Sequence, residues 1–482
     1  MADYHVWASG DNSDGLSWET AYQTLHAAIG GVPLAGGFDI IARAGAYAEN
    51  SGSNYLATAR AFTAPVVVRN ETIGGTDVIV NTSGAGTPAY LIDLNGAANL
   101  TFRDITFAAT QSNTSTVIAI RGTSANLTFI RCRTTAVGGM ASATGVNFIT
   151  NPTGSNFTFI GCAISGKGTT GGGGISAYGK SAAETISNLA FINCDVTTGG
   201  RFALRAKYVD GLTISGGHYE PLNQVLGQTA LWFGEDNNQT DGHVTGLVVT
   251  DVDVVSTGGH GILLGGITTS PIIDRVRIAA GGDYGFVDKS NGATVRNCLI
   301  VGGSTGPLVF KGTNWDGGNH TTTSTYDNCT IINTIGAGAL FVWEQVDEDA
   351  STMPYNCTLT NCAVKATAGV VFVRVAAFCT WANNMVFDHG VYQGTEGTIK
   401  PTITNSVNGT LSVDAMYIPF ANGNCDVGRG LPGKRLLGAS DVYGRSVLRA
   451  DAEAIGAVSP QRRNPRNILQ PIVQYASEMV SI

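Results

Sequence analysis

The chain has 482 residues and a net charge of −8, with only 13% charged residues, 64 glycines and 14 prolines. This balance argues against a nucleic-acid-binding protein, because phosphate backbones are bound by basic surfaces. No stretch approaches the about 18 apolar residues that a membrane-spanning helix needs. Abundant Ser, Thr, Asn, Val and Ile beside so much glycine predict a β-rich chain with many turns. We therefore expect no nucleic-acid partner and no membrane insertion.

The first predicted element is a short helix in "TAYQTLHAAIGG", residues 20–31. Thr20 and Gln23 match a capping box at its start, and Gly30 or Gly31 ends it. Its apolar side would cover the first coil of whatever follows, which begins with the strand-like "FDIIARAGAYAEN". The helix is therefore expected to cap the rest of the fold.

A phrase then recurs: "NLTFRDITFA" from Asn99, "NLTFIRCRTT" from Asn126, "NFTFIGCAIS" from Asn156 and "NLAFINCDVT" from Asn188. Further copies include "ATVRNCLIVG", "STYDNCTIIN" and "CTLTNCAVKA". Repeats spaced by roughly 20–50 residues are typical of a solenoid. The Asn-x-Thr triplets in these copies are interpreted as turn chemistry of the repeat, not as glycosylation sites.

Each copy alternates with the two-residue period of a strand. Leu127, Phe129 and Cys132 fall on one side, and Thr128 and Arg131 on the other. We therefore expect each phrase to form one coil of a parallel β-solenoid, with like residues stacked about 4.8 Å apart. The inner rows would be ladders of apolar side chains.

Six of the nine cysteines occupy the same position of the repeat: Cys132, Cys162, Cys194, Cys298, Cys329 and Cys362. This regularity predicts small, buried, reduced side chains and not disulfides or metal ligands. Four of the later copies place an asparagine directly before the cysteine position: Asn193, Asn297, Asn328 and Asn361. Their amides are expected to stack as a ladder at a bend.

Two segments resemble a known family. "DNSDGLSWETAYQTLHAAI" with "DIIARAGAYAEN", and the later "SDVYGRSVLRADAEAIGAVS", are similar to the entry and closing segments of right-handed parallel β-helix proteins of the pectate-lyase-like superfamily. The resemblance implies an all-β, right-handed parallel β-helix of about a dozen coils, with a short N-terminal capping helix and a C-terminal arm. The superfamily includes polysaccharide lyases, glycoside hydrolases, epimerases and phage tailspikes, so the fold alone does not fix the activity.

The expected organisation has four parts. Residues 1–45 form the N-terminal cap and first coil, 46–425 the β-helix, and 426–459 the C-terminal cap. Residues 460–482, with three prolines and three arginines, form an extended arm for oligomer or assembly contact.

Three long insertions, "GEDNNQTDGH", "GTNWDGGNHTTTST" and "EQVDEDASTMP", are expected to leave one edge of the helix. Each carries or adjoins a tryptophan and acidic residues, which suit sugar rings and hydroxyls. The expected substrate-binding residues are Trp232, Glu235, Lys289, Lys311, Trp315, Trp343 and Arg374. The alternative is structural: tryptophans covering a flank, and a salt-bridge ladder of Lys289, Lys311, Glu344 and Arg374.

Two catalytic arrangements are open. Asp316 and Glu344 come from neighbouring coils and match the carboxyl pair of a glycoside hydrolase. Lys289 or Lys311 with His320 would suit a lyase, which needs a base beside a group that neutralises a uronate carboxylate. Neither arrangement carries a diagnostic motif, and no metal or cofactor motif is present in the sequence. His260 is interpreted as a turn residue.

The chain starts "MADYHV" without a secretory signal, and its cysteines suit a reducing compartment. The favoured hypothesis is a bacteriophage virion protein, tailspike-like or particle-decorating, made in the host cytoplasm. It would be a homotrimer that binds host-cell polysaccharide and contacts other virion proteins through its arm or cap. The alternatives are a secreted polysaccharide lyase or glycoside hydrolase, and a structural capsid or tail decoration protein without sugar binding.

Overall fold

The computed structural model describes most of the chain up to residue 332 and short strands beyond it. The described residues are 3–49, 56–81, 89–110, 114–136, 142–149, 154–168, 172–179, 181, 184–222, 228–234, 242–265, 268–290, 292–302, 306–310, 314–315, 318–319, 324–332, 358–365, 381–383, 386–388, 402–404, 407–408, 448–449 and 452–453.

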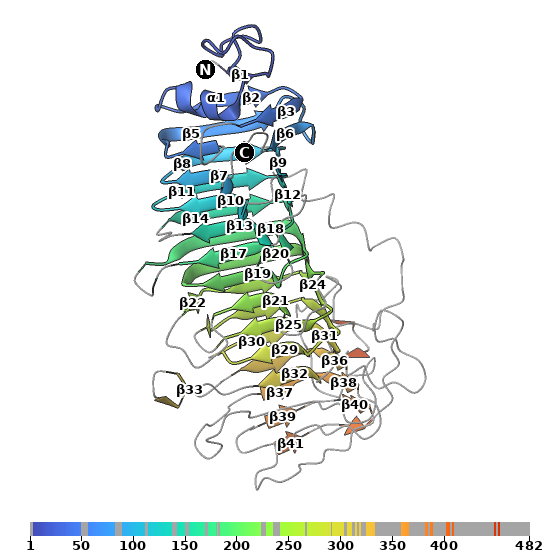
Figure 1. Ribbon diagram of the computed structural model, residues 1–482. Coiled ribbons are helices and arrows are strands. Elements are labelled where there is room, and N and C mark those ends of the chain that lie inside the picture. Colours follow the sequence, from blue (N-terminus) through green and yellow to red (C-terminus); the bar gives the residue numbers. More distant parts are fainter. Residues whose placement is uncertain are drawn as a thin grey trace.

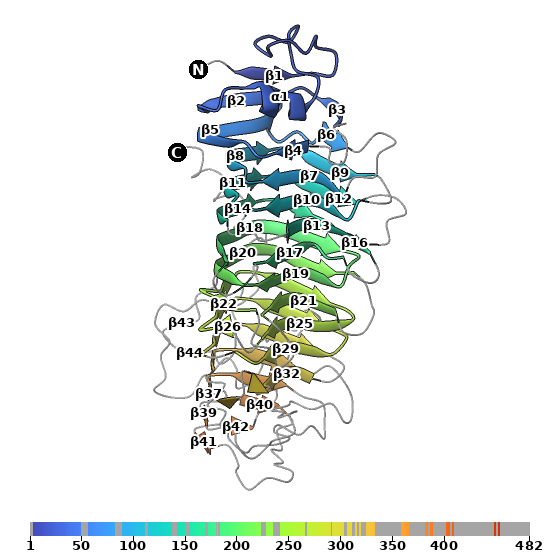
Figure 2. The ribbon, with the colours of Figure 1, turned by 60° about the vertical axis from the view of Figure 1, so that its left-hand side comes forward.

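The fold is a right-handed parallel β-helix with a single helix among the described residues, as predicted. Figures 1 and 2 show an elongated rod in which the strands of successive coils stack along one axis. A typical coil contains β10 (Thr116–Arg121), β11 (Ala125–Ile130) and β12 (Arg133–Ala136). These three strands belong to three sides of the rod, here called face 1, face 2 and face 3 in chain order.

Face 1 is the 11-stranded sheet, in which β16 is an antiparallel side strand. It contains β4 (Leu56–Thr58), β7 (Tyr90–Asn95), β10, β13 (Ser142–Ile149), β16 (Lys167–Gly168), β17 (Ile175–Tyr178), β19 (Phe202–Lys207), β21 (Gln228–Phe233), β25 (Gly259–Leu264), β29 (Tyr284–Asp288) and β32 (Gly306–Phe310).

Face 2 and face 3 together form the 29-stranded sheet, because the long strands β18 (Ile186–Thr198) and β20 (Val209–Pro221) run through both faces. The other strands of face 2 are β1 (Tyr4–Val6), β2 (Phe38–Ala42), β5 (Ala61–Asn70), β8 (Ala98–Arg103), β11, β14 (Ser155–Ile160), β23 (Val248–Thr250), β27 (Ile272–Asp274), β30 (Thr294–Arg296), β35 (Thr325–Asp327), β37 (Thr358–Thr360), β39 (Trp381–Asn383) and β41 (Thr402–Thr404).

The other strands of face 3 are β3 (Gly45–Ala48), β6 (Val78–Asn81), β9 (Thr106–Ala109), β12, β15 (Ala163–Ile164), β24 (Asp253–Ser256), β28 (Arg277–Ala280), β31 (Leu299–Gly302), β36 (Thr330–Ile332), β38 (Ala363–Lys365), β40 (Val386–Asp388) and β42 (Val407–Asn408). Short β22 (Val244–Thr245) and β26 (Thr268–Thr269) pair just before face 2. Two small hairpins are β33 (Asn314–Trp315) with β34 (Gly318–Asn319), and β43 (Leu448–Arg449) with β44 (Ala452–Glu453).

The capping helix α1 (Leu25–Gly31) begins later than the sequence predicts. Its N-cap is Thr24, whose hydroxyl accepts a hydrogen bond from the backbone N–H of Ala27 at 3.0 Å. Thr20 is not the cap, because its hydroxyl accepts a hydrogen bond from the backbone N–H of Ser17 instead. The apolar side of α1 is buried against the first strands, as expected for a cap.

The inside of the rod consists of stacked ladders. Phe102, Phe129, Phe159 and Phe191 lie in register on four successive coils, with neighbouring ring centroids 5.4, 4.7 and 4.9 Å apart. The six cysteines of the repeat are free and buried, which confirms their interpretation as small apolar side chains. The alternation of inner and outer residues read from the repeat is therefore the alternation of the structure.

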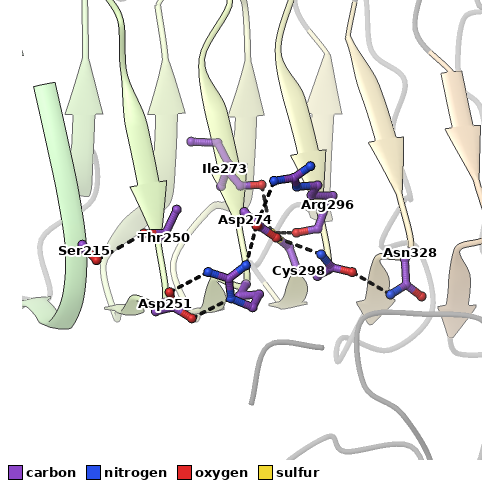
Figure 3. Close-up of polar contacts among 10 residues, drawn as sticks. Ser215, Thr250, Asp251, Ile273, Asp274, Arg296, Cys298 and Asn328 are labelled. Carbon is purple, nitrogen blue, oxygen red and sulfur yellow. Dashed lines mark hydrogen bonds and ion pairs between the residues drawn. The ribbon is translucent and has the colours of Figure 1, made fainter. Parts of the chain in front are cut away.

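The turn between face 2 and face 3 is a single residue with left-handed backbone conformation. Asn297 and Asn328 adopt φ of 55° and 52°, a conformation that asparagine tolerates better than most residues. Figure 3 shows the polar row along this turn, where the Asn328 amide donates to Asn297 Oδ1 at 2.7 Å. Asn361 departs from the predicted ladder because its amide donates to Asp327 at 2.6 Å.

A second amide ladder lies at the start of the face 2 strands. The amides of Asn126, Asn156 and Asn188 each donate to the asparagine one coil earlier, at 2.7, 2.8 and 3.0 Å. These residues also have positive φ, so the Asn-x-Thr triplets of the sequence are turn elements of the solenoid.

No helix among the described residues is long and apolar enough to cross a membrane.

Candidate functional site

The outer side of face 1 carries a cluster of cationic and aromatic side chains. β19 lies between β17 and β21, with Arg205 in register with Ser176 on one side and Trp232 on the other. The inner positions of β19 are Leu204 and Ala206, which are fully buried in the core. Because successive side chains of a strand alternate, Arg205 and Lys207 both point outward.

The cluster is held together by close cation–π contacts. The Arg205 guanidinium lies 3.8 Å from the ring centroid of Trp232 and 5.2 Å from that of Tyr178. The Lys207 ammonium lies 5.6 Å from the Tyr178 ring. Such stacking restricts the guanidinium plane, so Arg205 is preorganised for planar, two-pronged recognition of an anion. We call Tyr178, Arg205, Lys207 and Trp232 the cationic cluster.

The cluster presents hydrogen-bond donors. Burial raises the pKa of Tyr178 to about 12, opposed in part by the neighbouring Arg205, so the phenol stays protonated at neutral pH. The indole N–H of Trp232 is buried and has no hydrogen-bond partner among the described residues. Guanidinium and ammonium groups can only donate, which suits a ligand rich in acceptor oxygens such as carboxylates and hydroxyls.

Two of the sequence-predicted site residues lie on this face. Trp232 belongs to the cluster itself. Lys289 directly follows β29, and its backbone N–H donates to the carbonyl of Leu264 at 2.9 Å. It therefore occupies the same position of the coil as Lys207, three coils further along the rod.

The remaining predicted site residues cannot be placed. Glu235, Lys311, Asp316, His320, Trp343, Glu344 and Arg374 lie outside the described residues. For Trp315, only its backbone in the β33–β34 hairpin is described. The carboxyl pair of Asp316 and Glu344 and the lyase role of His320 therefore stay predictions.

Arg205 and Tyr178 are site residues that the sequence pattern did not predict. The available signal was the stretch "FALRAK", where Arg205 and Lys207 alternate with buried residues and so share one side of a strand. The aromatic partners come from the coils before and after, and only the register of β17, β19 and β21 brings them together.

A separate ion-pair network lies on the outer side of face 3. His218 Nδ1 is 2.9 Å from Asp253 Oδ2, and its Nε2 is 3.1 Å from Glu220 Oε2. Arg277 pairs with the other oxygen of Asp253 at 2.5 Å. Hydrogen bonding to Asp253 raises the pKa of His218 to about 9, so this side chain is a cation at neutral pH. A protonated, doubly paired histidine is an ion-pair element and not a free general base.

His260, expected to be a turn residue, lies on face 1 at the start of β25. Its Nδ1 is 3.4 Å from Asp283 Oδ2, and its ring is 5.8 Å from that of Tyr284. Within the described part of the chain, no three His, Cys, Asp or Glu side chains gather closely enough to hold a metal ion.

No family model matches the chain, and no curated protein sequence is similar to it. Among solved structures, a variant of a PL6 family alginate lyase matches with a TM-score of 0.50 and 13% identity, over 91% of this chain and 58% of that chain. Tailspike protein 3 of bacteriophage CBA120 matches with a TM-score of 0.41 and 11% identity, over 76% of this chain and 56% of that chain. Pectate lyase Pel9A matches with a TM-score of 0.40 and 13% identity, over 96% of this chain and 98% of that chain.

These likenesses concern the fold. The chain has the right-handed parallel β-helix that is found in the alginate lyase, the first of these structures. It spans little more than half the length of the alginate lyase and tailspike chains. At such identities the activity has to be argued from the residues of this chain.

Proposed function

We propose that the protein is a polysaccharide-binding β-helix protein of a bacteriophage particle, tailspike-like or particle-decorating. The observation that carries the binding proposal is the cationic cluster on face 1, where Arg205 is stacked between Trp232 and Tyr178. Aromatic rings beside fixed donors are the groups that bind sugar rings and their oxygens.

The sign of the charge points to an acidic polymer. The whole chain has a net charge of −8, whereas the charged side chains of the cluster, Arg205 and Lys207, are cations, and Lys289 lies three coils away on the same face. A local charge opposite to that of the molecule attracts an anionic ligand while the rest of the surface repels it. Host-cell polysaccharides that carry carboxylates are therefore the preferred ligands.

The location in a virion is supported by the cysteines. The six described cysteines are free and buried, and their stacked positions leave no disulfide framework such as secreted proteins often carry. We infer folding in a reducing cytoplasm and assembly there as a homotrimer. Other virion proteins would contact the N-terminal cap, residues 1–45, or the C-terminal arm, residues 460–482.

Binding is tested with Arg205→Ala against an array of bacterial capsule, lipopolysaccharide and uronate polymers. We expect the wild type to bind at least one acidic polymer and the variant to bind it roughly tenfold to hundredfold more weakly, because a charge-assisted contact is lost. Arg133→Ala is the control, since it removes the same charge from an exposed position on face 3. Equal weakening by both variants, or no binding by the wild type, would contradict the proposal and favour a purely structural decoration protein.

A polysaccharide lyase is the second candidate. Arg205 and Lys207 project from the same side of one strand, so Arg205 can neutralise a uronate carboxylate while Lys207, as the neutral amine, takes the proton from the carbon beside it. The electron pair forms the C=C bond of the unsaturated uronate as the bond to the glycosidic oxygen breaks, and that oxygen leaves with a proton. Incubation with the same polymers distinguishes the two functions through the ultraviolet absorbance of unsaturated uronate ends. Under this candidate Lys207→Ala would bind the polymer but release no unsaturated product. New reducing ends without that absorbance would instead indicate hydrolysis.

A further inference from the structure

Face 2 carries an uncharged strip along the middle of the rod. The strip consists of two rows of outward-facing residues that run across five neighbouring strands, β11, β14, β18, β20 and β23. One row is in register with Thr128 and the other with Ile130. One row includes Thr158 and Thr213, and the other includes Ile160 and Ile192. Every residue at these positions is Thr, Ile, Ala, Ser or Val, and each of these strands pairs in parallel with the next. Figure 1 shows β11 and β14 on adjacent coils.

The isoleucines of the strip are partly exposed, whereas several large outward-facing apolar residues on the other two faces are buried. Outward residues of face 1, Leu263 and Val287, and of face 3, Leu299 and Ile332, are at most 2% exposed and form their own small clusters. The isoleucines of the strip keep intermediate exposure. A row of stacked, partly exposed isoleucines on a flat sheet is the kind of surface that proteins cover by association.

We propose that this strip faces the symmetry axis of a homo-oligomer whose subunits stand parallel to one another along the rod. The inference rests on the homotrimer of the proposed function and assigns its interface. Around an axis parallel to the rod, each residue meets the same residue of the other copies. A charged residue at the axis would meet the same charge on the other copies and be repelled. A face that lines such an axis is therefore expected to be uncharged, and the residues of the strip carry no charge.

Most of the charges that border the strip have a partner within the chain. Arg103, in register with Ile130, shares Asp104 with Arg131, at 3.5 and 2.7 Å, so this end of the strip keeps one positive charge. Arg69, one coil nearer the cap, is 2.6 Å from Asp39. At the other end of the strip, Asp274 is 3.2 Å from Arg296. Between copies that stand in parallel, the paired charges above and below the strip oppose each other less than unpaired charges would.

One pair of hydroxyls in the strip is already hydrogen-bonded within the chain. The Thr250 hydroxyl donates to the Ser215 hydroxyl at 3.3 Å, a contact directed along the rod within one chain (Figure 3). A hydroxyl that is already paired costs less to bury than one that must find a new partner across the interface. The methyl groups of the threonines and the isoleucine side chains then supply the contact.

The test compares Ile160→Glu with Ala163→Glu by light scattering coupled to gel filtration. The two positions lie on the same coil, but Ala163 is exposed on face 3. We expect the wild type and Ala163→Glu to be oligomers and Ile160→Glu to be a monomer, because its carboxylates would meet at the axis. Ile192→Glu, one coil away, is expected to behave in the same way, and circular dichroism checks that each variant stays folded.

Cross-linking gives a second readout. With a short bifunctional thiol reagent, Ile160→Cys is expected to link one copy to another in high yield, because the axis brings equivalent positions together. Ala163→Cys and the wild type supply the background. A monomeric wild type, or a Glu variant that stays oligomeric, would overturn the proposal. Polysaccharide binding by a monomeric wild type would leave the binding function standing and remove only the interface.

Discussion

Glu49 shows how one buried residue holds the cap on the rod. Its carboxylate is completely buried and accepts hydrogen bonds from the backbone N–H groups of Leu25 at 2.7 Å and His26 at 3.0 Å, at the start of α1. Burial raises the pKa of Glu49 to about 7, against the opposing effect of these two donors. Nothing in the sequence around Glu49 indicates this role, because its partners are more than twenty residues away.

The raised pKa predicts a pH dependence of stability. The folded protein binds a proton at Glu49 more tightly than the unfolded chain, so the contribution of Glu49 to stability is greatest below pH 4.5 and is lost as the pH rises through about 7. Glu49→Gln does not titrate at this position. We expect the difference in unfolding free energy between wild type and variant to change by about 3 kcal/mol across this window, in favour of the variant at the higher pH. Urea unfolding at several pH values measures it, and a constant difference would refute the assignment.

At the scale of the repeat, the turn between face 2 and face 3 combines backbone conformation with amide stacking. Asn328 is 1% exposed, adopts φ of 52°, and donates to Asn297. Asn126, in the other ladder, adopts nearly the same φ of 53° and donates to Asn99, but it is exposed. Because the two residues share the backbone conformation and differ in burial, comparing their substitutions distinguishes the free-energy cost of the strained backbone from that of the lost buried hydrogen bond.

Asn328→Ala is expected to destabilise the protein by about 2–4 kcal/mol, because it strains the left-handed turn and leaves a buried amide oxygen unpaired. Asn126→Ala carries the strain and the loss of two exposed hydrogen bonds, to Asn99 and from Asn156, and is expected to cost about 1–2 kcal/mol. Asn328→Gly relieves the strain and isolates the amide contribution. Equal losses in the two alanine variants, measured by urea unfolding, would show that burial of the ladder is unimportant.

The repeat is predictable from the sequence because each strand reports its own inner and outer sides. The stacking of Phe129 and Phe159 and the burial of Cys132 follow from alternation alone. The clusters on the outer side of the rod do not follow from alternation. The strand β25, "GHGILL", is buried on both sides, so its sequence does not alternate between apolar and polar residues. To predict the cationic cluster, one has to know which residues of successive coils lie side by side. The insertions between coils differ in length, so the sequence alone does not give this alignment.

At the scale of the whole molecule, the two cysteine stacks report on whether the rod unfolds as one unit. Cys132, Cys162 and Cys194 lie beside the phenylalanine ladder and near the capped end. Cys298, Cys329 and Cys362 lie further along the rod, where the same inner row holds Val295, Tyr326 and Leu359. In a solenoid each coil is stabilised mainly by its neighbours, so regions with different cores can open separately.

Burial raises the pKa of the Cys162 and Cys329 thiols, so neither reacts readily until its coil opens. Because the phenylalanine ladder buries larger side chains, we expect the first stack to stay protected to a higher urea concentration than the second. Pulse labelling with a thiol reagent, read peptide by peptide by mass spectrometry, follows each stack separately. Simultaneous labelling of all six cysteines would mean that the rod unfolds as a single cooperative unit. Its stability would then be determined by the interface between copies or by the cap, and not by the core of each coil.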